Sequence, residues 1–409
     1  MSAIADKQLA LLNASWRASL ARSPWAQALR ERYDLPMRFE SWNQFGDEVP
    51  QLGRSELTGL VSSVSASRRG FRWLSTGGST SEPFRFPVFR RDDGSGRRLA
   101  REARSGLGVA PRDRLFLLWG HAHLFGEGLS AMVARWRRAI ADRALGYCRF
   151  SAYRLSPEDL RRAGDALLRH RSRYVIGYSS ALDRFARANK DRSEAFADLR
   201  LKVVIATAEG FPADDSRSVI QSCLGAPVVM EYGAMESGII AYERRDRPGF
   251  DVFWRRHRLE VKSDVGQQLE RELVITSLYP RALPLLRYRI GDLIEPEYDG
   301  EDLVSLASVA GRCNDVVRLS DGTPIHSELI THVMRSQPGV TGFQILNRSG
   351  ADPEIRYEGL AFAEAVETHV RRRLATVHPS LAKVALSHVR LLKRSRAGKL
   401  PLVVEARPQ

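Results

Sequence analysis

The sequence predicts an α/β protein with a large N-terminal α/β domain, residues 1–311, and a small α+β domain, residues 312–409. Short apolar, β-branched and aromatic runs alternate with helical stretches in the larger region, which is typical of a sheet whose strands are buried by helices. After about residue 312 the pattern changes to a compact set of short elements. The length of 409 residues also exceeds what one hydrophobic core usually holds, so more than one domain is expected.

The larger region is expected to begin with a helix and to continue with a series of strands. Apolar residues recur at helical spacing over residues 7–31, which predicts an amphipathic helix interrupted near Pro24. Helices are also expected over residues 129–143 and 180–189. The expected strands contain the runs FRWL from residue 71, LFLLW from 115, YVIGY from 174, KVVIAT from 202, PVVMEY from 227 and LVITSL from 273.

The sequence of the smaller region predicts a separate group of helices and strands. A turn is expected at Asp321-Gly322, and glycine in the run RSRAGKLPLVVE indicates a second turn before a terminal strand. The other expected elements are a helix from His326, strands near 340–347 and 353–357, a helix over 361–374 and a strand over 386–393.

The charge is strongly positive, with 63 basic and 48 acidic residues and a formal net charge of +15. The arginines are scattered in short pairs, and no helix-turn-helix, zinc-finger or RNP-like string is present. We therefore expect solvated arginine-rich faces that attract acidic partners, and no nucleic-acid binding.

The cysteines and the N-terminal segment both favour a cytoplasmic protein. Cys148, Cys223 and Cys313 lie far apart, without the CxxC spacing of a zinc site or the even number of a disulfide framework. Charged residues interrupt the first 23 residues every few positions, which fits neither a secretory signal nor a membrane span.

A hydroxyl-rich loop, Ser75-Thr76-Gly77-Gly78-Ser79-Thr80-Ser81-Glu82-Pro83, lies between two expected strands. Small residues let backbone N–H groups approach a ligand closely, and the hydroxyls add donors, so the loop could hold polyphosphate oxygens. It is not a Walker A loop, because it has no lysine and a strand follows. Taken alone, a loop of this composition is usually an ordinary polar hairpin.

Further motifs follow downstream in a fixed order. They are Ala208-Glu209-Gly210, the run EYGAME over residues 231–236, RYRIGDL over 287–293, GRCND over 311–315 and Gly398-Lys399. In this order the chain, from about residue 40 onward, resembles the adenylate-forming superfamily of acyl-CoA synthetases, peptide-synthetase adenylation domains and luciferases. The branch that it most resembles is the phenylacetate-CoA ligase-like one.

The resemblance implies a fold and a reaction. The fold would be a large domain with several β-sheets sandwiching helices and a small mobile C-terminal domain that turns about a hinge near residues 312–315. The reaction would be ATP- and Mg²⁺-dependent and AMP-forming: a carboxylic acid, aromatic or small, becomes an acyl-adenylate and then passes to a thiol. The thiol would belong to CoA or to the phosphopantetheine of an acidic acyl carrier protein. An amine acceptor, and a degenerate member that binds without turnover, remain alternatives.

The resemblance also implies roles for single residues. Asp292 would accept hydrogen bonds from both ribose hydroxyls, and Arg312 would add a donor near the ribose or the α-phosphate. Glu236 would help to hold Mg²⁺. The expected phosphate-loop residues are Thr76, Gly78, Ser79 and Thr80, and those beside adenine are Ala208, Glu209, Glu231, Tyr232 and Gly233.

Lys399 would be the catalytic cation of the first half-reaction. Negative charge accumulates on the phosphoryl oxygens as pyrophosphate leaves, and an ammonium stabilises that state more than the ground state. Asn314 falls at the hinge position, where the family usually has aspartate, and the neighbouring Asp315 could take over that role. His123, Phe125, Tyr178 and Ala234 are expected to line the acyl pocket.

Other enzyme classes are disfavoured. His121 and His123 have no third ligand at a useful spacing for a metal site. The GxSxG elbow of serine hydrolases and the GxGxxG loop of dinucleotide oxidoreductases are both absent from the sequence.

Overall fold

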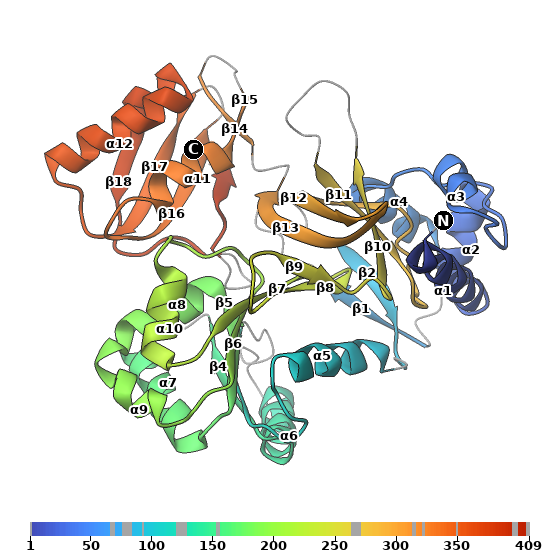
Figure 1. The fold of residues 1–409 in the computed structure, drawn as a ribbon, viewed down its shortest axis with the longest axis horizontal. Helices are drawn as coiled ribbons and strands as arrows, with labels where there is room; N and C mark the ends of the chain where they lie inside the picture. Colours follow the sequence, from blue (N-terminus) through green and yellow to red (C-terminus); the bar gives the residue numbers. More distant parts are fainter. Residues whose placement is uncertain are drawn as a thin grey trace. The chain divides into compact units, whose positions relative to one another are not determined.

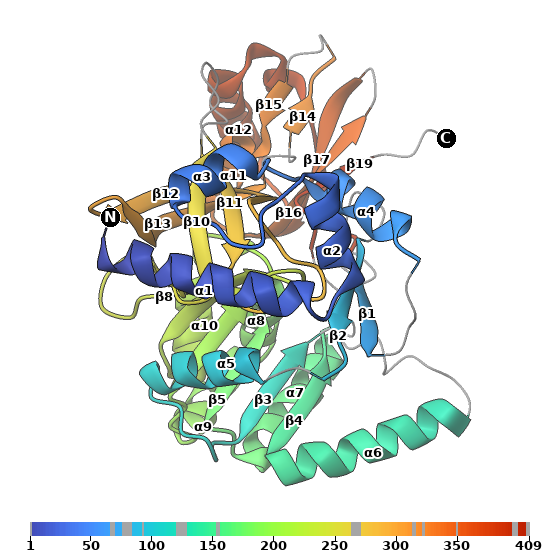
Figure 2. The ribbon, with the colours of Figure 1, turned by 90° about the vertical axis from the view of Figure 1, so that its right-hand side faces the viewer.

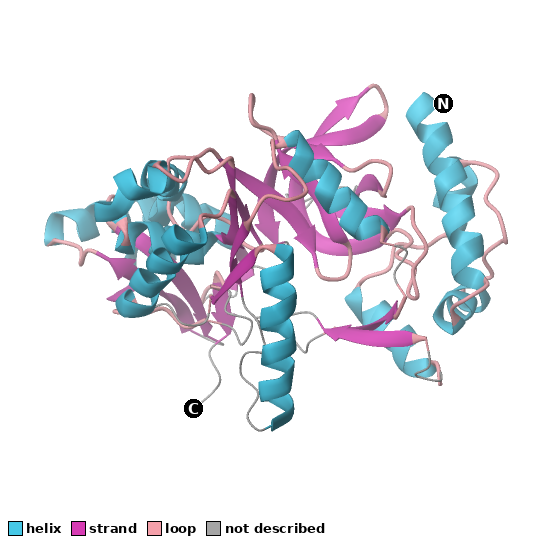
Figure 3. Cartoon of the chain, turned by 90° about the horizontal axis from the view of Figure 1, so that it is seen from below, coloured by secondary structure: helices cyan, strands magenta, loops and turns pink. Residues whose placement is uncertain are grey.

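The computed structural model describes residues 2–65, 70–75, 84–91, 94–119, 129–152, 156–262, 271–312, 316–320, 324–348, 351–394 and 400–405. The chain divides into two compact units, each with its own internal contacts. The first comprises residues 1–78, 82–100 and 232–314, and the second comprises residues 79–81, 101–231 and 315–409. The expected boundary between residues 311 and 312 stays a prediction. Figure 3 shows both helices and strands along the chain, which confirms the predicted α/β class.

The first unit begins with helices that short polar side chains cap. These are α1 (Ala3–Leu20), α2 (Pro24–Arg32), α3 (Trp42–Glu48) and α4 (Arg54–Ser63). The Ser23 side chain accepts a hydrogen bond from the Ala26 amide and Pro24 occupies the first turn of α2, so the expected interruption near Pro24 is present. Gln8 of α1 donates to the carbonyl of Trp254 over 2.8 Å and to that of His257, at the start of β10, over 3.3 Å (Figure 2).

The strands of the first unit are antiparallel. The hairpin of β1 (Phe71–Ser75) and β2 (Arg85–Phe89) contains the expected strand from residue 71. The remaining strands run in the order β10-β11-β12-β13-β9-β8. Their bounds are β8 (Gly238–Glu243), β9 (Phe250–Val252), β10 (His257–Lys262), β11 (Glu272–Ser277), β12 (Tyr288–Asp299) and β13 (Asp302–Arg312), and α5 (Ser95–Gly106) connects the two units.

The second unit contains a parallel sheet in the order β7-β6-β5-β3-β4. All five residues of β5 and of β6 are buried, as expected for parallel strands covered by helices. Figure 1 shows α7 to α10 beside β5 and β6. The bounds are β3 (Leu115–Trp119), α6 (Leu129–Leu145), β4 (Tyr147–Ser151), α7 (Pro157–His170), β5 (Tyr174–Tyr178), α8 (Ser179–Ala188), α9 (Ser193–Ala197), β6 (Val203–Thr207), α10 (Ser216–Leu224) and β7 (Val228–Ala234).

The C-terminal part of the second unit has a smaller sheet in the order β18-β17-β16-β19. Residues such as Phe343, Ile355 and Leu374 form its own buried core. Its elements are β14 (Val316–Arg318), β15 (Pro324–His326), α11 (Ser327–Arg335), β16 (Val340–Arg348), β17 (Ala351–Gly359), α12 (Glu364–Val377), β18 (Ala385–His388) and β19 (Val403–Glu405).

The strand predicted over 386–393 is only partly present, because β18 ends at His388. Beyond it, the backbone amides of Leu392 and Lys393 donate to the side chains of Glu358 and Gln344 instead of to a neighbouring strand. The expected turn at Asp321-Gly322 lies outside the described residues. Within the described parts of the chain, none of the helices combines the length and apolar character needed to span a bilayer.

Candidate functional site

The sequence-predicted ribose residue Asp292 lies on β12 and is 7% exposed. The Tyr232 hydroxyl, from the end of β7, donates to Oδ2 of Asp292 over 2.8 Å. Arg312 of β13 is the register partner of Asp292, while its side chain is outside the described residues. A carboxylate has about four acceptor positions, so Asp292 can accept ligand hydroxyls in addition to Tyr232. The structure thus brings two predicted nucleotide residues into direct contact.

Gly233 is required by the fold itself. A Cβ at this position would lie 2.4 Å from the carbonyl oxygen of Gly238 and 3.0 Å from the Cα of Ile239. Because backbone atoms cannot move aside as a side chain can, only glycine fits this approach of β7 and β8. Gly233 therefore sets the position of its neighbour Tyr232, independently of any contact between Gly233 and a ligand.

Glu236, the predicted magnesium ligand, is 3% exposed. The Tyr288 hydroxyl donates to its Oε1 over 3.2 Å, and a guanidinium nitrogen of Arg54 lies 3.9 Å from the same oxygen. Burial raises the pKa of Tyr288, and the nearby Glu236 carboxylate raises it further. Tyr288 is therefore a neutral hydroxyl at physiological pH, and it orients Glu236 as a hydrogen-bond donor.

The main chain around Glu236 is fixed as well. Arg281 donates to the backbone carbonyl of Glu236, and the Tyr279 hydroxyl donates to that of Ser237 over 2.8 Å. Ser237 accepts a hydrogen bond from the amide of Ala234, a predicted acyl-pocket residue. The main chain at residues 236 and 237 is thereby held by side chains of the connection between β11 and β12.

In the second unit, the predicted adenine residues Ala208 and Glu209 follow the carboxyl end of β6, and Glu231 lies within β7. In parallel α/β sheets, ligands bind outside the carboxyl ends of the strands. Ala208 has a φ of 74°, a left-handed conformation that alanine rarely adopts. Such a backbone costs on the order of 1–3 kcal/mol and is often found at functional sites. Glu231, in the middle of β7, accepts from the Thr207 hydroxyl over 3.3 Å.

The Glu209 carboxylate contacts protein groups through both of its oxygens. Oε1 accepts from the Ser180 amide over 3.1 Å and from the Ser180 hydroxyl. Oε2 accepts from the Leu400 amide over 2.8 Å. Glu209 therefore caps the N-terminus of α8 and binds the chain that leads into β19.

Tyr178, a predicted acyl-pocket residue, is buried at the end of β5, and its ring centroid lies 4.7 Å from that of Trp119. The remaining predicted site residues lie outside the described residues: Thr76, Gly78, Ser79, Thr80, His123, Phe125, Asn314, Asp315 and Lys399.

Sequence reasoning missed Arg54 and the role of Tyr288. Tyr288 belongs to the RYRIGDL run, so its position within a motif was a usable signal. Arg54 lies at the start of α4, 182 positions before Glu236, and no local pattern connects the two residues.

No family model and no curated protein matches the sequence. Among solved structures, a 2-hydroxyisobutyryl-CoA ligase in the postadenylation state, in complex with 2-HIB-AMP, matches 98% of this chain and 89% of its own chain, with a TM-score of 0.73 and 18% identity.

Two other solved structures match less of the chain. An anthranilate CoA ligase, AuaEII, in complex with anthranoyl-AMP has a TM-score of 0.57 and 15% identity over 82% of this chain and 67% of its own. The amide bond synthetase McbA from Marinactinospora thermotolerans has a TM-score of 0.55 and 16% identity over 83% of this chain and 70% of its own. The resemblance predicted from the motifs is thus confirmed at the level of the fold: this chain has the fold of the adenylate-forming ligases.

Proposed function

We propose that the protein is an ATP-dependent, AMP-forming ligase that activates a carboxylic acid as an acyl-adenylate and transfers the acyl group to a second nucleophile. The observation that carries the proposal is the hydrogen bond between Tyr232 and Asp292. Both residues match motif positions that contact the nucleotide in adenylate-forming enzymes. The fold shared with CoA ligases and an amide bond synthetase supports the same reaction class.

In the first half-reaction, an oxygen of the substrate carboxylate attacks the α-phosphorus of ATP. The bond between that phosphorus and the bridging oxygen breaks, and pyrophosphate leaves with the electron pair. Asp292 holds the ribose through its hydroxyls, and Tyr232 fixes the orientation of the Asp292 carboxylate. Thr76, Gly78, Ser79 and Thr80 are proposed to donate to the phosphates, and Lys399 to the α-phosphate and substrate carboxylate.

Glu236 fits a magnesium site that is completed by substrate oxygens. Mg²⁺ is usually held by one or two carboxylates together with substrate phosphates. Glu236 would bind the ion together with substrate oxygens, and Tyr288 would orient its carboxylate. When bound, Mg²⁺ would neutralise charge on the departing phosphate oxygens.

In the second half-reaction, a nucleophile attacks the acyl carbonyl carbon, loses its proton, and AMP leaves. A thiol is the preferred acceptor, from CoA or from the phosphopantetheine of an acidic carrier protein, because the net charge of +15 favours polyanionic partners. An amine acceptor is the second candidate, since the amide bond synthetase matches almost as well as the anthranilate CoA ligase. The acid is proposed to be aromatic or small.

The proposal is tested by incubating the protein with ATP, Mg²⁺, a panel of aromatic and small acids, and either CoA, a phosphopantetheinylated carrier protein or a primary amine. The nucleotide product and the acyl product are then identified by mass spectrometry. We expect AMP, formed only when an acid is present, and one acyl product that identifies the acceptor. Binding of nucleotide without acid-dependent AMP formation would instead indicate a non-catalytic member, and ADP as the product would exclude the mechanism.

A further inference from the structure

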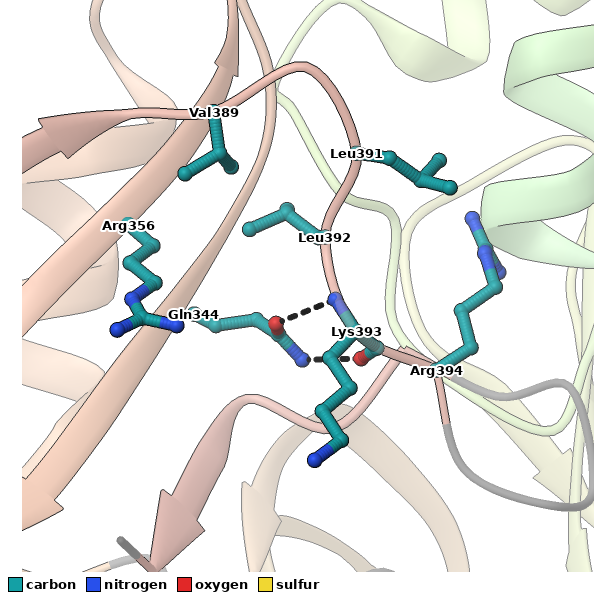
Figure 4. Close-up of a pocket in the computed structure, with 7 residues that line it drawn as sticks. All are labelled: Gln344, Arg356, Val389, Leu391, Leu392, Lys393 and Arg394. Atoms are coloured by element: carbon teal, nitrogen blue, oxygen red, sulfur yellow. Dashed lines mark hydrogen bonds between the residues drawn. The ribbon is translucent and has the colours of Figure 1, made fainter.

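The C-terminal part of the second unit has a surface hollow of about 440 Å³, and Figure 4 shows the residues that line it. The amide of Gln344 exchanges two hydrogen bonds with the backbone of Lys393 there. Two cations at the hollow are also engaged, because Arg356 pairs with Glu354 and Arg394 donates to the hydroxyl of a serine in α8. Most polar groups of this hollow are therefore already used by the protein.

A groove in the first unit differs, because its polar groups are not used in this way. Its volume is about 390 Å³, and it lies between α1 and the turn that precedes β10. Lys7, Ala10 and Leu11 line it from α1, and Trp254 and Arg255 line it from the turn. Small-molecule sites have volumes of about 300–1,000 Å³, so the groove is large enough for one small ligand.

The first wall of the groove is a face of α1 that the fold leaves uncovered. The buried side chains of α1 recur three or four positions apart, as at Leu12 and Trp16. Because residues at this spacing lie side by side on a helix, Lys7, Ala10 and Leu11 form a strip beside the buried face. Lys7 and Ala10 are exposed, and Leu11 is half-buried. The strip is thus accessible and fixed to a well-packed helix.

Hydrogen bonds hold the second wall in place. The buried side chain of Gln8 donates to the Trp254 carbonyl over 2.8 Å and to the His257 carbonyl over 3.3 Å. The His257 amide donates to the Phe253 carbonyl over 3.0 Å, and the Phe253 amide donates to the Ile240 carbonyl of β8 over 2.9 Å. Since both walls are fixed by the fold, the groove is formed before a ligand binds.

The two cations at the groove pair with no carboxylate among the residues that the structure describes. The neighbours of Lys7 on the helix surface, at positions 3, 4, 10 and 11, are all apolar. The Arg255 guanidinium carbon lies 4.4 Å from the centre of the Trp254 ring, which holds that charge beside the groove. Arg256 stacks on Tyr279 instead, over 3.7 Å. Both Lys7 and Arg255 can therefore pair with an anion.

The other groups of the groove indicate what the anion should carry. The indole ring of Trp254, together with Ala10 and Leu11, supplies an apolar surface. The indole N–H of Trp254 donates to no protein atom within the described ranges, so it is a further donor for a carboxylate. An uncharged apolar molecule would leave the two cations unused, and an inorganic anion would leave the apolar surface unused. An aromatic ring with a carboxylate uses both.

We propose that this groove is a binding site for a small aromatic carboxylate. The carboxylate pairs with Lys7 and Arg255, and the ring lies against Leu11 and Trp254. None of these residues belongs to the candidate nucleotide site or to the expected acyl pocket, so the groove binds such a molecule whether or not the protein is a ligase.

The test is a titration without ATP, followed through the indole N–H signals of ¹⁵N-labelled tryptophan by NMR. Trp254→Phe identifies the signal of Trp254. The probe is 2-naphthylacetate; 2-naphthylacetamide keeps the ring without the charge, and inorganic phosphate keeps a charge without the ring. We expect 2-naphthylacetate to shift the Trp254 signal with a dissociation constant on the order of 1 mM, as for a small ligand in an open groove. The two comparison compounds should bind about tenfold more weakly.

Three variants test the two cations. Lys7→Met and Arg255→Met each remove one charge and keep an aliphatic stem, so each should weaken binding of 2-naphthylacetate about two- to fivefold, the range of exposed ion pairs. Neither should change binding of 2-naphthylacetamide. Arg17→Met is the matched control, because Arg17 is exposed in the last turn of α1, about 15 Å further along the helix axis. It should match the wild type.

Another tryptophan of α1 verifies that the variants are folded. Trp16 is buried, and its indole N–H donates to the Pro36 carbonyl over 2.9 Å. Its signal should keep its position in all three variants, because the packing of α1 does not depend on Lys7, Arg17 or Arg255.

Several results would overturn the proposal. They are an unshifted Trp254 signal, equal affinity for 2-naphthylacetate and 2-naphthylacetamide, and unchanged affinity in either Lys7→Met or Arg255→Met. A shift confined to the indole of Trp119, which lies beside Tyr178, would also overturn it, because the acid would then occupy the expected acyl pocket. Since the titration contains no ATP, a protein that forms no AMP with any acid should still bind the probe here.

Discussion

Replacing Asp292 by asparagine tests the assignment of the ribose site. Two ribose hydroxyls that donate to one carboxylate make two charge-assisted hydrogen bonds, each contributing about 1.5–3 kcal/mol. The asparagine oxygen can keep one of them, so binding should weaken by the other, or about 10- to 150-fold. The Tyr232 hydroxyl, 2.8 Å from the carboxylate, can still donate to the asparagine oxygen, so the free energy of unfolding should change little.

The assay is calorimetric binding of ATP and of 2′-deoxy-ATP to the wild type and to Asp292→Asn. The wild type should prefer ATP, and the variant should lose most of that preference, because the 2′-hydroxyl no longer finds its acceptor. Asp299→Asn is the control, since Asp299 is exposed at the end of the same strand. Undiminished preference for ATP in Asp292→Asn would refute the reasoning.

Three further variants test other parts of the structure. Gly233→Ala should lower the free energy of unfolding by about 1–3 kcal/mol, measured by urea denaturation, because its Cβ would meet the Gly238 carbonyl; unchanged stability would contradict the close approach. Tyr288→Phe should raise the Mg²⁺ concentration needed for half-maximal activity about tenfold, since Glu236 loses its orienting donor; an unchanged requirement would argue against Glu236 as the ligand. Burial lowers the pKa of His257 to about 3, so between that value and about 6.5 only the unfolded state is protonated. Stability should therefore fall as the pH drops below about 6.5, by about 2 kcal/mol at pH 5, and His257→Gln should remove that loss in urea denaturation at pH 7.5 and 5.

The strands and the order of the motifs could be predicted because both are local properties of the sequence. The runs LFLLW, YVIGY and KVVIAT contain β3, β5 and β6, since continuous apolar, β-branched segments favour buried parallel strands. From the sequence, Tyr232 and Asp292 could only be expected to lie near each other, because both belong to motifs with an expected role in nucleotide binding. Their hydrogen bond depends on how the last residues of β7, which from Tyr232 onward belong to the first unit, lie relative to β12.

The contacts that Leu392, Arg394 and Leu400 make with distant parts of the chain could not be predicted in this way. The bond from Leu400 to Glu209 joins residues 191 positions apart, and that between Arg184 and Glu358 joins residues 174 positions apart. No local pattern specifies such pairs. The strand predicted over 386–393 ends early for the same reason, because distant side chains, Gln344 and Glu358, take the backbone donors.

The most direct test of the central claim is acid-dependent exchange of labelled pyrophosphate into ATP by the wild type and by Lys399→Ala. The wild type should exchange label only when a suitable acid is present, and the variant should be slower by about 10²- to 10³-fold. Transfer from a supplied acyl-adenylate should survive in the variant. Exchange that needs no acid, or that Lys399→Ala leaves intact, would contradict the account.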